Sequence, residues 1–229
     1  MAELGSAEAA VFLASRNRKK LEEMERILAP RVPGIRVLGL DDVAAYPEPV
    51  EDQPDFAGNA LLKARAGLAV TGLPSLADDS GLCVDALNGM PGVLSARWSG
   101  PASLWEGEAG PNSSGAGDPS RATQDQRNNA LLLAQLQDVP DERRGAHFTC
   151  AVALCLPDGT EHVVHGRMDG RVIREVRGSG GFGYDVLFCA EGHDVTTAEL
   201  SRDEKDAISH RGRALAQVAP LVAAAFSAD

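Results

Sequence analysis

The sequence predicts an α/β or α+β fold whose sheet is not all parallel, and two observations lead to that prediction. The chain opens with a short apolar run at 10–14, a polar turn, and apolar residues at helical spacing that stop before Pro30. Two strand-like runs, 148–156 and 161–166, flank the turn Pro157-Asp158-Gly159 and form a candidate hairpin. Strands and helices therefore mix along the chain, and the hairpin connections argue against an all-parallel sheet.

Hydrophobic spacing places the remaining elements of the N-terminal half. Alanines and leucines at 57–70 recur on one helical face and predict a helix. Short apolar runs at 32–40, 75–77 and 82–87 are predicted strands. The acidic segment 78–81 is predicted to be a turn, because Asp, Ser and Gly all favour turns.

The C-terminal half begins with a segment at 99–120 that is rich in Gly, Pro, Ser and Ala, which predicts a flexible surface loop. Regular structure then resumes, with a helix at 124–136, strands at 171–176 and 186–189, and a final amphipathic helix at 210–226 for which Ser209 is the candidate N-cap.

The length of 229 residues and the 44% hydrophobic content predict one globular domain over 10–229, preceded by a frayed tail at 1–9. The tail carries no Lys or Arg, and no run reaches the roughly 18 apolar residues of a membrane span. We therefore expect neither a secretory signal nor a membrane partner.

The net charge of −11 would repel a nucleic-acid polymer, although a few local cations and a metal ion could still hold a mononucleotide. The four cysteines lie in apolar runs without a CxxC pair, which is typical of reduced thiols in a cytoplasmic protein. Cys150 and Cys155 with His162 and His165 do not match the spacing of a zinc site.

A first polar cluster lies between a predicted strand and the N-terminus of a predicted helix. The helix dipole and unpaired backbone N–H groups at such a position favour an anion, which makes the cluster a candidate phosphate site. Its members are Ser15, Arg16, Asn17, Arg18, Lys19 and Lys20. The alternative is an ordinary capped turn with solvated basic side chains.

Two adjacent carboxylates, Asp78 and Asp79, follow a short strand and suit a hard cation such as Mg²⁺, which prefers oxygen ligands. Acidic residues of the earlier loop, such as Glu51, could add a ligand. The alternative is again a plain turn.

The Gly-rich run 178–185 matches the GxGxxG pattern, but it precedes a strand late in the chain, whereas the dinucleotide fingerprint opens a helix early in a βαβ unit. Glycines beside Phe182 and Tyr184 instead suit close approach to a flat ligand and stacking on a base. Downstream, Lys205 can meet a phosphate, and His210 and Arg211 can donate to a base; a solvated helix start is the alternative.

Six motifs share their order and spacing with one known family: Ser15-x-Asn17-x-x-Lys20-x-x-Glu23, Asn59-Ala60-x-x-Lys63-Ala64, Ala77-Asp78-Asp79-Ser80-Gly81-Leu82, Pro91-Gly92-Val93-x-Ser95-Ala96-Arg97, Gly180-Gly181-Phe182-Gly183-Tyr184-Asp185 and Ser209-His210-Arg211. By these motifs the chain resembles the inosine triphosphate pyrophosphatase family, also called XTP/dITP diphosphohydrolases, from Val11 to about Val218. The resemblance implies Mg²⁺-dependent hydrolysis of ITP, dITP and XTP to the monophosphate and pyrophosphate. It also implies a homodimer and an elongated, two-lobed α/β structure, with a mixed central β-sheet flanked by helices and a nucleotide-binding cleft between the lobes.

The resemblance also implies roles for individual residues. Asp79 matches the family's catalytic position and, with Glu51, a metal position. The residues implied to bind substrate are Ser15, Arg16, Asn17, Arg18, Lys19 and Lys20 on the triphosphate, Ser80 and Lys205 on the substrate, Phe182, Gly183, Tyr184 and Asp185 at the base, and His210 and Arg211 as readers of the purine.

Two departures from the family pattern stand out. Gly58 occupies a position where relatives often carry Glu, and 104–120 is an expected loop insertion. Three other functions remain open on the sequence: a related pyrophosphatase for pyrimidine or modified nucleotides, a nucleotide-binding module without catalysis, and a purely structural or interaction protein.

Overall fold

The computed structural model describes residues 9–105 and 123–227, without the side chains of Lys19, Ala102 and Trp105. Nearly all of the expected tail at 1–9 and most of the expected insertion at 104–120 lie outside the described residues. By contacts, the chain divides into two compact units. The first unit takes its described residues from Met1–Asp79, Cys150–Gly166 and His210–Asp229, and the second unit from Ser80–Thr149 and Arg167–Ser209.

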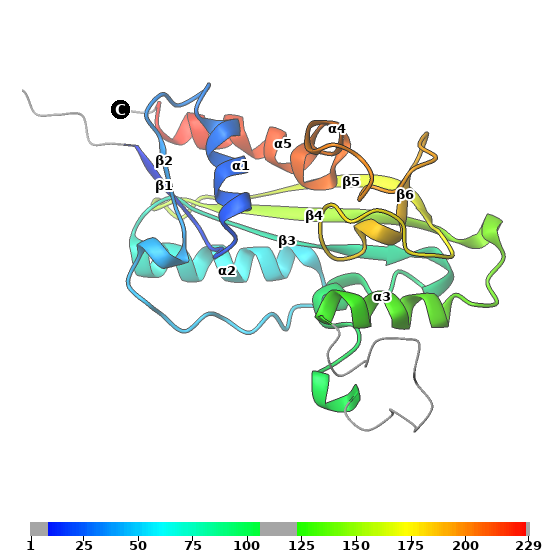
Figure 1. Ribbon diagram of the computed structural model, residues 1–229. Coiled ribbons are helices and arrows are strands. Elements are labelled where there is room, and N and C mark those ends of the chain that lie inside the picture. Colours follow the sequence, from blue (N-terminus) through cyan, green and yellow to red (C-terminus); the bar gives the residue numbers. More distant parts are fainter. Residues whose placement is uncertain (1–8, 106–122, 228–229) are drawn as a thin grey trace, which may run out of the picture. The chain divides into compact units, whose positions relative to one another are not determined.

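A six-stranded mixed sheet runs through the fold in the order β2-β1-β3-β4-β5-β6, which confirms the predicted α/β class (Figure 1). Strand β1 pairs in parallel with β2 and β3, whereas β5 and β6 are antiparallel. The strands are β1 (Ala10–Leu13), β2 (Arg36–Leu38), β3 (Ser75–Val84), β4 (Gly145–Cys155), β5 (Glu161–Val172) and β6 (Phe188–Ala190).

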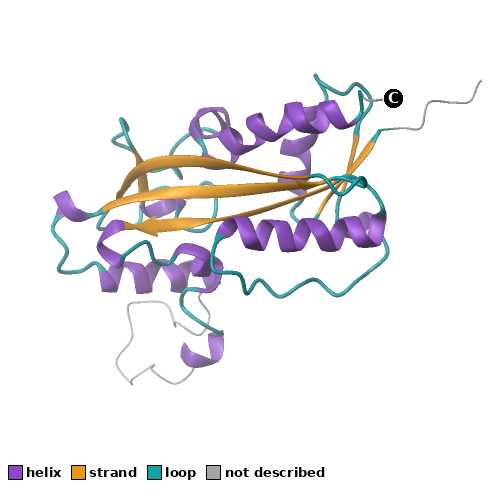
Figure 2. Ribbon diagram, turned by 180° about the vertical axis from the view of Figure 1, so that it is seen from behind, coloured by secondary structure: helices purple, strands orange, loops and turns teal. Residues whose placement is uncertain are grey.

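The helices begin and end at residues that suit those positions. The N-cap Asp55 accepts a hydrogen bond of 2.8 Å from the Gly58 amide, and Gly72 ends the same helix with a positive φ of 68°. Among the described residues, no helix is long and apolar enough to cross a membrane. The α-helices, labelled in Figure 1 and drawn among the purple helices of Figure 2, are α1 (Arg18–Leu28), α2 (Phe56–Thr71), α3 (Gln124–Gln135), α4 (Arg202–Ile208) and α5 (His210–Ala225).

The first unit buries both faces of β4. Alternate residues of a strand point to opposite faces, and Cys150, Val152 and Leu154 pack with α1 and α5, while Ala151 and Ala153 pack with α2. Figure 1 shows α2 on the opposite side of these strands from α1 and α5. The sheet of the first unit is therefore a buried middle layer, as expected for a strand that reads as an unbroken apolar run.

The second unit has a core of its own. The apolar residues of α3 pack there with those of the ends of β3 and β5, and with β6. Its fully buried members include Leu82, Leu132, Leu136, Leu187 and Phe188.

Several strand predictions need correction. The strand expected at 32–40 is reduced to β2, because Pro33 lacks an amide hydrogen and Gly34 turns the chain with a φ of +79°. The turn expected at 78–81 is wrong, since these residues continue β3 without a break. The run 82–87 leaves the strand after Val84 and enters a 3-10 helix, η2 (Asp85–Leu87).

Two further corrections concern the C-terminal half. The strands expected at 161–166 and 171–176 are one continuous strand, β5, which ends at Val172. Half of the run 186–189 belongs to the short 3-10 helix η7 (Asp185–Leu187), and β6 starts only at Phe188. Helices α1, α2, α3 and α5 lie where helical spacing predicted them, and Ser209 directly precedes α5.

Candidate active site

The two adjacent carboxylates of β3 serve opposite faces of the sheet. Because side chains alternate along a strand, Asp78 lies on the face covered by α1 and α5, and Asp79 on the face covered by α2. Each carboxylate meets basic or amide groups from the helices on its own face. A sequence that reads as an acidic turn thus builds two separate polar clusters.

Asp78 is the centre of a buried ion cluster. The Lys20 ammonium lies 2.8 Å from both of its carboxylate oxygens, and Arg211 Nε lies 3.2 Å from Oδ2. The Asp78 and Arg211 side chains are only 7% and 11% exposed. Burial alone raises the pKa of Asp78, but the charges of Lys20 and Arg211 outweigh it and hold the pKa well below its ordinary value.

Asp79 lies in the second cluster, with two residues of α2. Asn59 Nδ2 donates to Asp79 Oδ2 over 2.9 Å, and Lys63 Nζ lies 3.9 Å from Oδ1. Burial, with help from the nearby charges of Glu51 and Asp78, raises the pKa of Asp79 against the opposing effects of Lys63 and Asn59. A carboxylate with a raised pKa is a better proton acceptor than an ordinary one.

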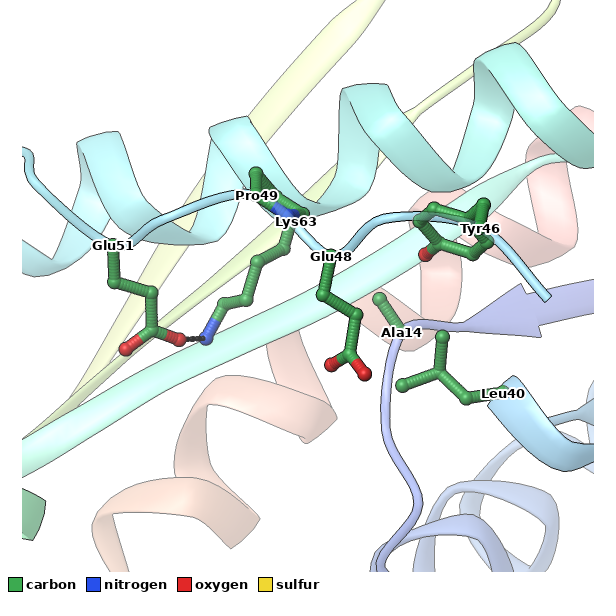
Figure 3. A pocket seen from close by; sticks show the side chains of 7 residues that line it. All are labelled: Ala14, Leu40, Tyr46, Glu48, Pro49, Glu51 and Lys63. Carbon is green, nitrogen blue, oxygen red and sulfur yellow. Dashed lines mark hydrogen bonds and ion pairs between the residues drawn. The ribbon is translucent and has the colours of Figure 1, made fainter.

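Lys63 joins the second cluster to the acidic loop. Its ammonium lies 2.6 Å from a carboxylate oxygen of Glu51 and donates to the Asp78 carbonyl over 2.7 Å. Figure 3 shows the Glu51 carboxylate meeting this ammonium, with the Glu48 carboxylate extending from the same segment beside Ala14. These groups border a cavity of about 250 Å³, lined by Ala14, Leu40, Tyr46, Glu48, Pro49, Glu51 and Lys63.

The donor set around Lys63 fits a magnesium ion that keeps part of its shell for substrate. Within residues 9–105 and 123–227, no group of three or more His, Cys, Asp or Glu side chains is arranged to hold a metal by itself. Mg²⁺ usually takes one or two carboxylates and completes its shell with water and substrate phosphates. Glu51 and Asp79, both within reach of one lysine, match that requirement.

The predicted phosphate cluster divides between the surface and the interior. Ser15 accepts from the Asn17 amide over 3.1 Å and shapes the turn before α1. Arg16 is exposed and pairs with Asp41 and Glu48, at 3.0 and 2.6 Å, and Arg18 forms an exposed pair with Glu22. Lys20 is directed inward to Asp78, while the side chain of Lys19 lies outside the described part of the structure.

In the second unit, Asp185 organises the Gly-rich loop. It forms an ion pair with Lys205, and it accepts hydrogen bonds of 2.8 Å from both the Phe182 amide and the Thr197 hydroxyl. A Cβ atom on Gly181 would lie 2.1 Å from Asp185 Oδ2, so that close approach requires glycine.

Of the two aromatic residues in this loop, only Phe182 presents its ring to solvent. Phe182 is 54% exposed, and the Lys205 ammonium lies 5.2 Å from its ring centroid. Tyr184 is 3% exposed, and its hydroxyl donates to the Ser95 carbonyl over 2.9 Å. Burial and the charge of Asp125 raise the pKa of Tyr184.

Sequence reasoning gave no role to Asn59 and Lys63, and it predicted Asp78 only as a candidate cation ligand. Asn59 and Lys63 lie one helical turn apart on α2, which is otherwise rich in Ala and Leu, and Asn59 is fully buried. Polar residues at this spacing on an apolar face were the available signal. The anchoring role of Asp78 had no such signal, because its partners lie 58 and 133 positions away in the chain.

The chain is similar in sequence and in fold to known proteins. The chain matches the Ham1 family over residues 11–221. It is 56% identical over 217 residues to a dITP/XTP pyrophosphatase of Nocardia farcinica, with 94% of this chain and 96% of that protein covered.

Solved structures agree with these sequence matches. The fold is similar to a nucleoside-triphosphatase / dITP/XTP pyrophosphatase from Mycobacterium abscessus, with a TM-score of 0.71 and 50% identity over 92% of this chain and 99% of that one. It is also similar to a HAM1 protein from Coxiella burnetii, with a TM-score of 0.77 and 37% identity over 93% and 98% of the two chains.

Proposed function

The chain belongs to the Ham1 family, and on that premise we propose that it is a nucleoside triphosphate pyrophosphatase that hydrolyses ITP, dITP and XTP to the monophosphate and pyrophosphate. The observation that carries the proposal is the pair of polar clusters on β3, one around Asp78 and one around Asp79. Within one unit, these clusters provide positively charged side chains in fixed positions and a carboxylate that can accept a proton. Phosphoryl transfer depends mainly on such positioning and on stabilisation of negative charge.

The proposed reaction is attack of water on the α-phosphorus. The new bond joins the water oxygen to phosphorus, the bond from phosphorus to the bridging oxygen breaks, and pyrophosphate leaves. Asp79 accepts the proton of the attacking water through Oδ1, because Asn59 fixes Oδ2 by a 2.9 Å hydrogen bond. Lys63 pairs with both Glu51 and Asp79 and thereby fixes the positions of the two carboxylates. It also lines the pocket, where its ammonium would donate to phosphate oxygens.

Mg²⁺ would be held through Glu51 and Asp79, where it would neutralise charge on the phosphate oxygens. Lys20 is proposed to contribute positive charge to triphosphate binding from the first turn of α1, with Ser15 and Asn17 in the turn before it. Arg16 and Arg18 pair with carboxylates at the surface, and their share in substrate binding is correspondingly smaller in this proposal.

His210 and Arg211, at the start of α5, are proposed to read the purine. Hypoxanthine and xanthine carry an acceptor oxygen at position 6, whereas adenine carries an amino group there. A site that donates to position 6, with Arg211 as the proposed donor, would meet an amino group in adenine, and such mismatches can reach roughly 10⁴-fold in specificity. Phe182 is the proposed stacking surface, with Lys205 beside it.

The test is pyrophosphate release from ITP, XTP, dITP, GTP, ATP and TTP, with Mg²⁺ and with EDTA. We expect fast release from the first three nucleotides, and loss of that release when EDTA removes the metal. Release from other nucleotides only would overturn the base assignment. ITP binding without release from any nucleotide would replace the enzyme proposal by a binding module.

We further propose that the protein works in the cytoplasm as a homodimer. Sedimentation equilibrium at micromolar concentration should give twice the mass of the chain. A monomer throughout the concentration range would contradict the dimer and leave the proposed chemistry untouched.

A further inference from the structure

Helix α3 holds both backbone groups of one residue in the Gly-rich loop. The Gly183 amide donates to Asp125 Oδ2 over 2.7 Å, and Asn129 Nδ2 donates to the Gly183 carbonyl over 2.9 Å. Asp125 and Asn129 are four residues apart, so they lie on the same face of α3. All three residues belong to the second unit.

The two hydrogen bonds from Asp125 and Asn129 to Gly183 form a clamp on that residue. Helix α3, which carries both side chains, is itself held by hydrogen bonds. Thr123 and Gln126 form a capping box at its N-terminus. Asn128 donates to the carbonyl oxygens of Ser95 and Ala96 over 3.1 and 3.2 Å, and the Ser95 carbonyl also accepts from Tyr184. Buried polar networks whose members all find partners make the surrounding structure rigid.

The clamp acts on the residue that follows the exposed aromatic ring. Gly183 has a φ of +61°, a left-handed conformation that only glycine adopts at no cost. On the other side of the ring, the Phe182 amide is held by Asp185. Phe182 is therefore an exposed ring on a backbone that is fixed both at its own amide and at the next residue.

We propose that Asp125 and Asn129 are positioning residues for base recognition: they hold Gly183, and through it Phe182, in the place where the ring stacks on the purine of the nucleotide. The inference rests on the proposed function, which assigns the base to Phe182. Asp79 and Lys63 belong to the first unit, so loss of the clamp should weaken substrate binding and base discrimination while the chemical step is retained.

The variants follow from the two hydrogen bonds. Asp125→Ala and Asn129→Ala each remove one partner of Gly183, and each should raise KM for ITP about tenfold, the scale of one hydrogen bond that includes a buried or charged group. The value of kcat should stay within about twofold of wild type. Asp125→Asn keeps an acceptor oxygen at the same place and should leave KM close to its wild-type value. Asp138→Asn, at an exposed residue just beyond α3, is the matched control.

A double-mutant cycle tests whether the clamp acts through the ring. In a Phe182→Ala background, Asn129→Ala should cause no further rise in KM, because the group that it positions has already been removed. Phe182 is exposed, so this background should fold even if Asn129→Ala alone lowers stability.

Several results would overturn the inference. These are an unchanged KM in both alanine variants, an equal loss of kcat and kcat/KM with KM constant, or full additivity of Phe182→Ala and Asn129→Ala. Failure of the proposed function looks different, since wild-type protein would then release no pyrophosphate from ITP or XTP. Circular dichroism of every variant separates both results from misfolding.

Discussion

Asp78 and Asp79 are neighbours in the chain with different surroundings. The pKa of Asp78 lies well below its ordinary value, because Lys20 and Arg211 outweigh its burial, whereas burial raises the pKa of Asp79. One carboxylate is thus a permanent anion that holds two cations, and the other is suited to accept a proton. Strand alternation places the two carboxylates on opposite faces of the sheet, and the groups on each face then determine their different roles.

Asp79→Asn keeps the shape of the side chain and removes its capacity as a base. We expect kcat for ITP to fall by at least about two orders of magnitude, which is the scale of a lost acid–base group. Pyrophosphate release at saturating ITP is the measurement, with circular dichroism as the control for folding. Turnover close to that of wild type would show that Asp79 has no part in the chemical step.

Asp78→Asn should act on stability as well as activity. It leaves the buried charges of Lys20 and Arg211 without their carboxylate, and breaking a buried pair in this way costs about 3–5 kcal/mol. Asp41→Asn is the matched control, because its partner Arg16 is exposed and such surface pairs contribute about 0–1 kcal/mol. Urea unfolding measures both, and equal losses would show that the Asp78 cluster does not support the fold.

Among the elements, β3 shows best what sequence reasoning could and could not reach. The helical spacing of α1, α2, α3 and α5 is a local property, and it predicted these helices to within a few residues. The segment 78–81 has the composition of a turn, yet it stays in the strand because its carboxylates find partners far away in the chain. The strand and turn preferences of single residues do not include such distant partners, so they could not predict that the strand continues.

The candidate site, too, could be predicted from the sequence only in part. Motif order was enough to point to Asp79, Lys20 and Arg211, since each lies in a short recognisable segment. The side chains that orient them were harder to find, because Asn59 and Lys63 read as part of an ordinary amphipathic helix. Sequence also left both aromatics of the Gly-rich loop as stacking candidates, and only their burial separates them.

The contact between β5 and α5 gives a prediction at the scale of elements. A Cβ atom on Gly166 would lie 1.9 Å from the His210 carbonyl oxygen and 2.7 Å from the Ala214 amide nitrogen, so α5 can pack this closely only against glycine. Gly166→Ala should force the first turn of α5 outward and cost about 1–3 kcal/mol, as overpacking does.

Because that turn carries His210 and Arg211, Gly166→Ala should also reduce the preference for ITP over ATP. Thermal unfolding and the ratio of kcat/KM values for the two nucleotides are the measurements. A variant with unchanged stability would show that the strand and helix separate without cost, contrary to the packing described.

At the scale of the whole molecule, the four cysteines can serve as probes of unfolding in both units. All are buried and unpaired, with Cys150 and Cys155 in the first unit and Cys83 and Cys189 in the second. Burial is the main cause that raises the pKa of Cys150 to about 12 and that of Cys155 to about 11. A raised thiol pKa means less thiolate at any pH below it, and thiolate is the reactive form.

Native protein at pH 8 should therefore resist alkylation by iodoacetamide, and all four thiols should react once urea unfolds the chain. Mass spectrometry of labelled peptides, taken along the urea transition, would show whether thiols of the two units become reactive together. Rapid labelling of Cys150 or Cys155 in the native state would contradict the burial described here.

The interleaving of the chain also has a consequence during synthesis. The core of the first unit combines Val11, Leu21 and Leu28 with Leu215 and Val218, so its first and last apolar residues are about 200 positions apart. At about 5–20 residues per second, a ribosome takes roughly 10–40 s to cover that distance. The nascent N-terminal segment must wait that long for α5, while every segment of the second unit has already been made. The unit that begins the chain is thus the last whose core can be completed, and its N-terminal apolar residues are without their C-terminal partners for the longest time.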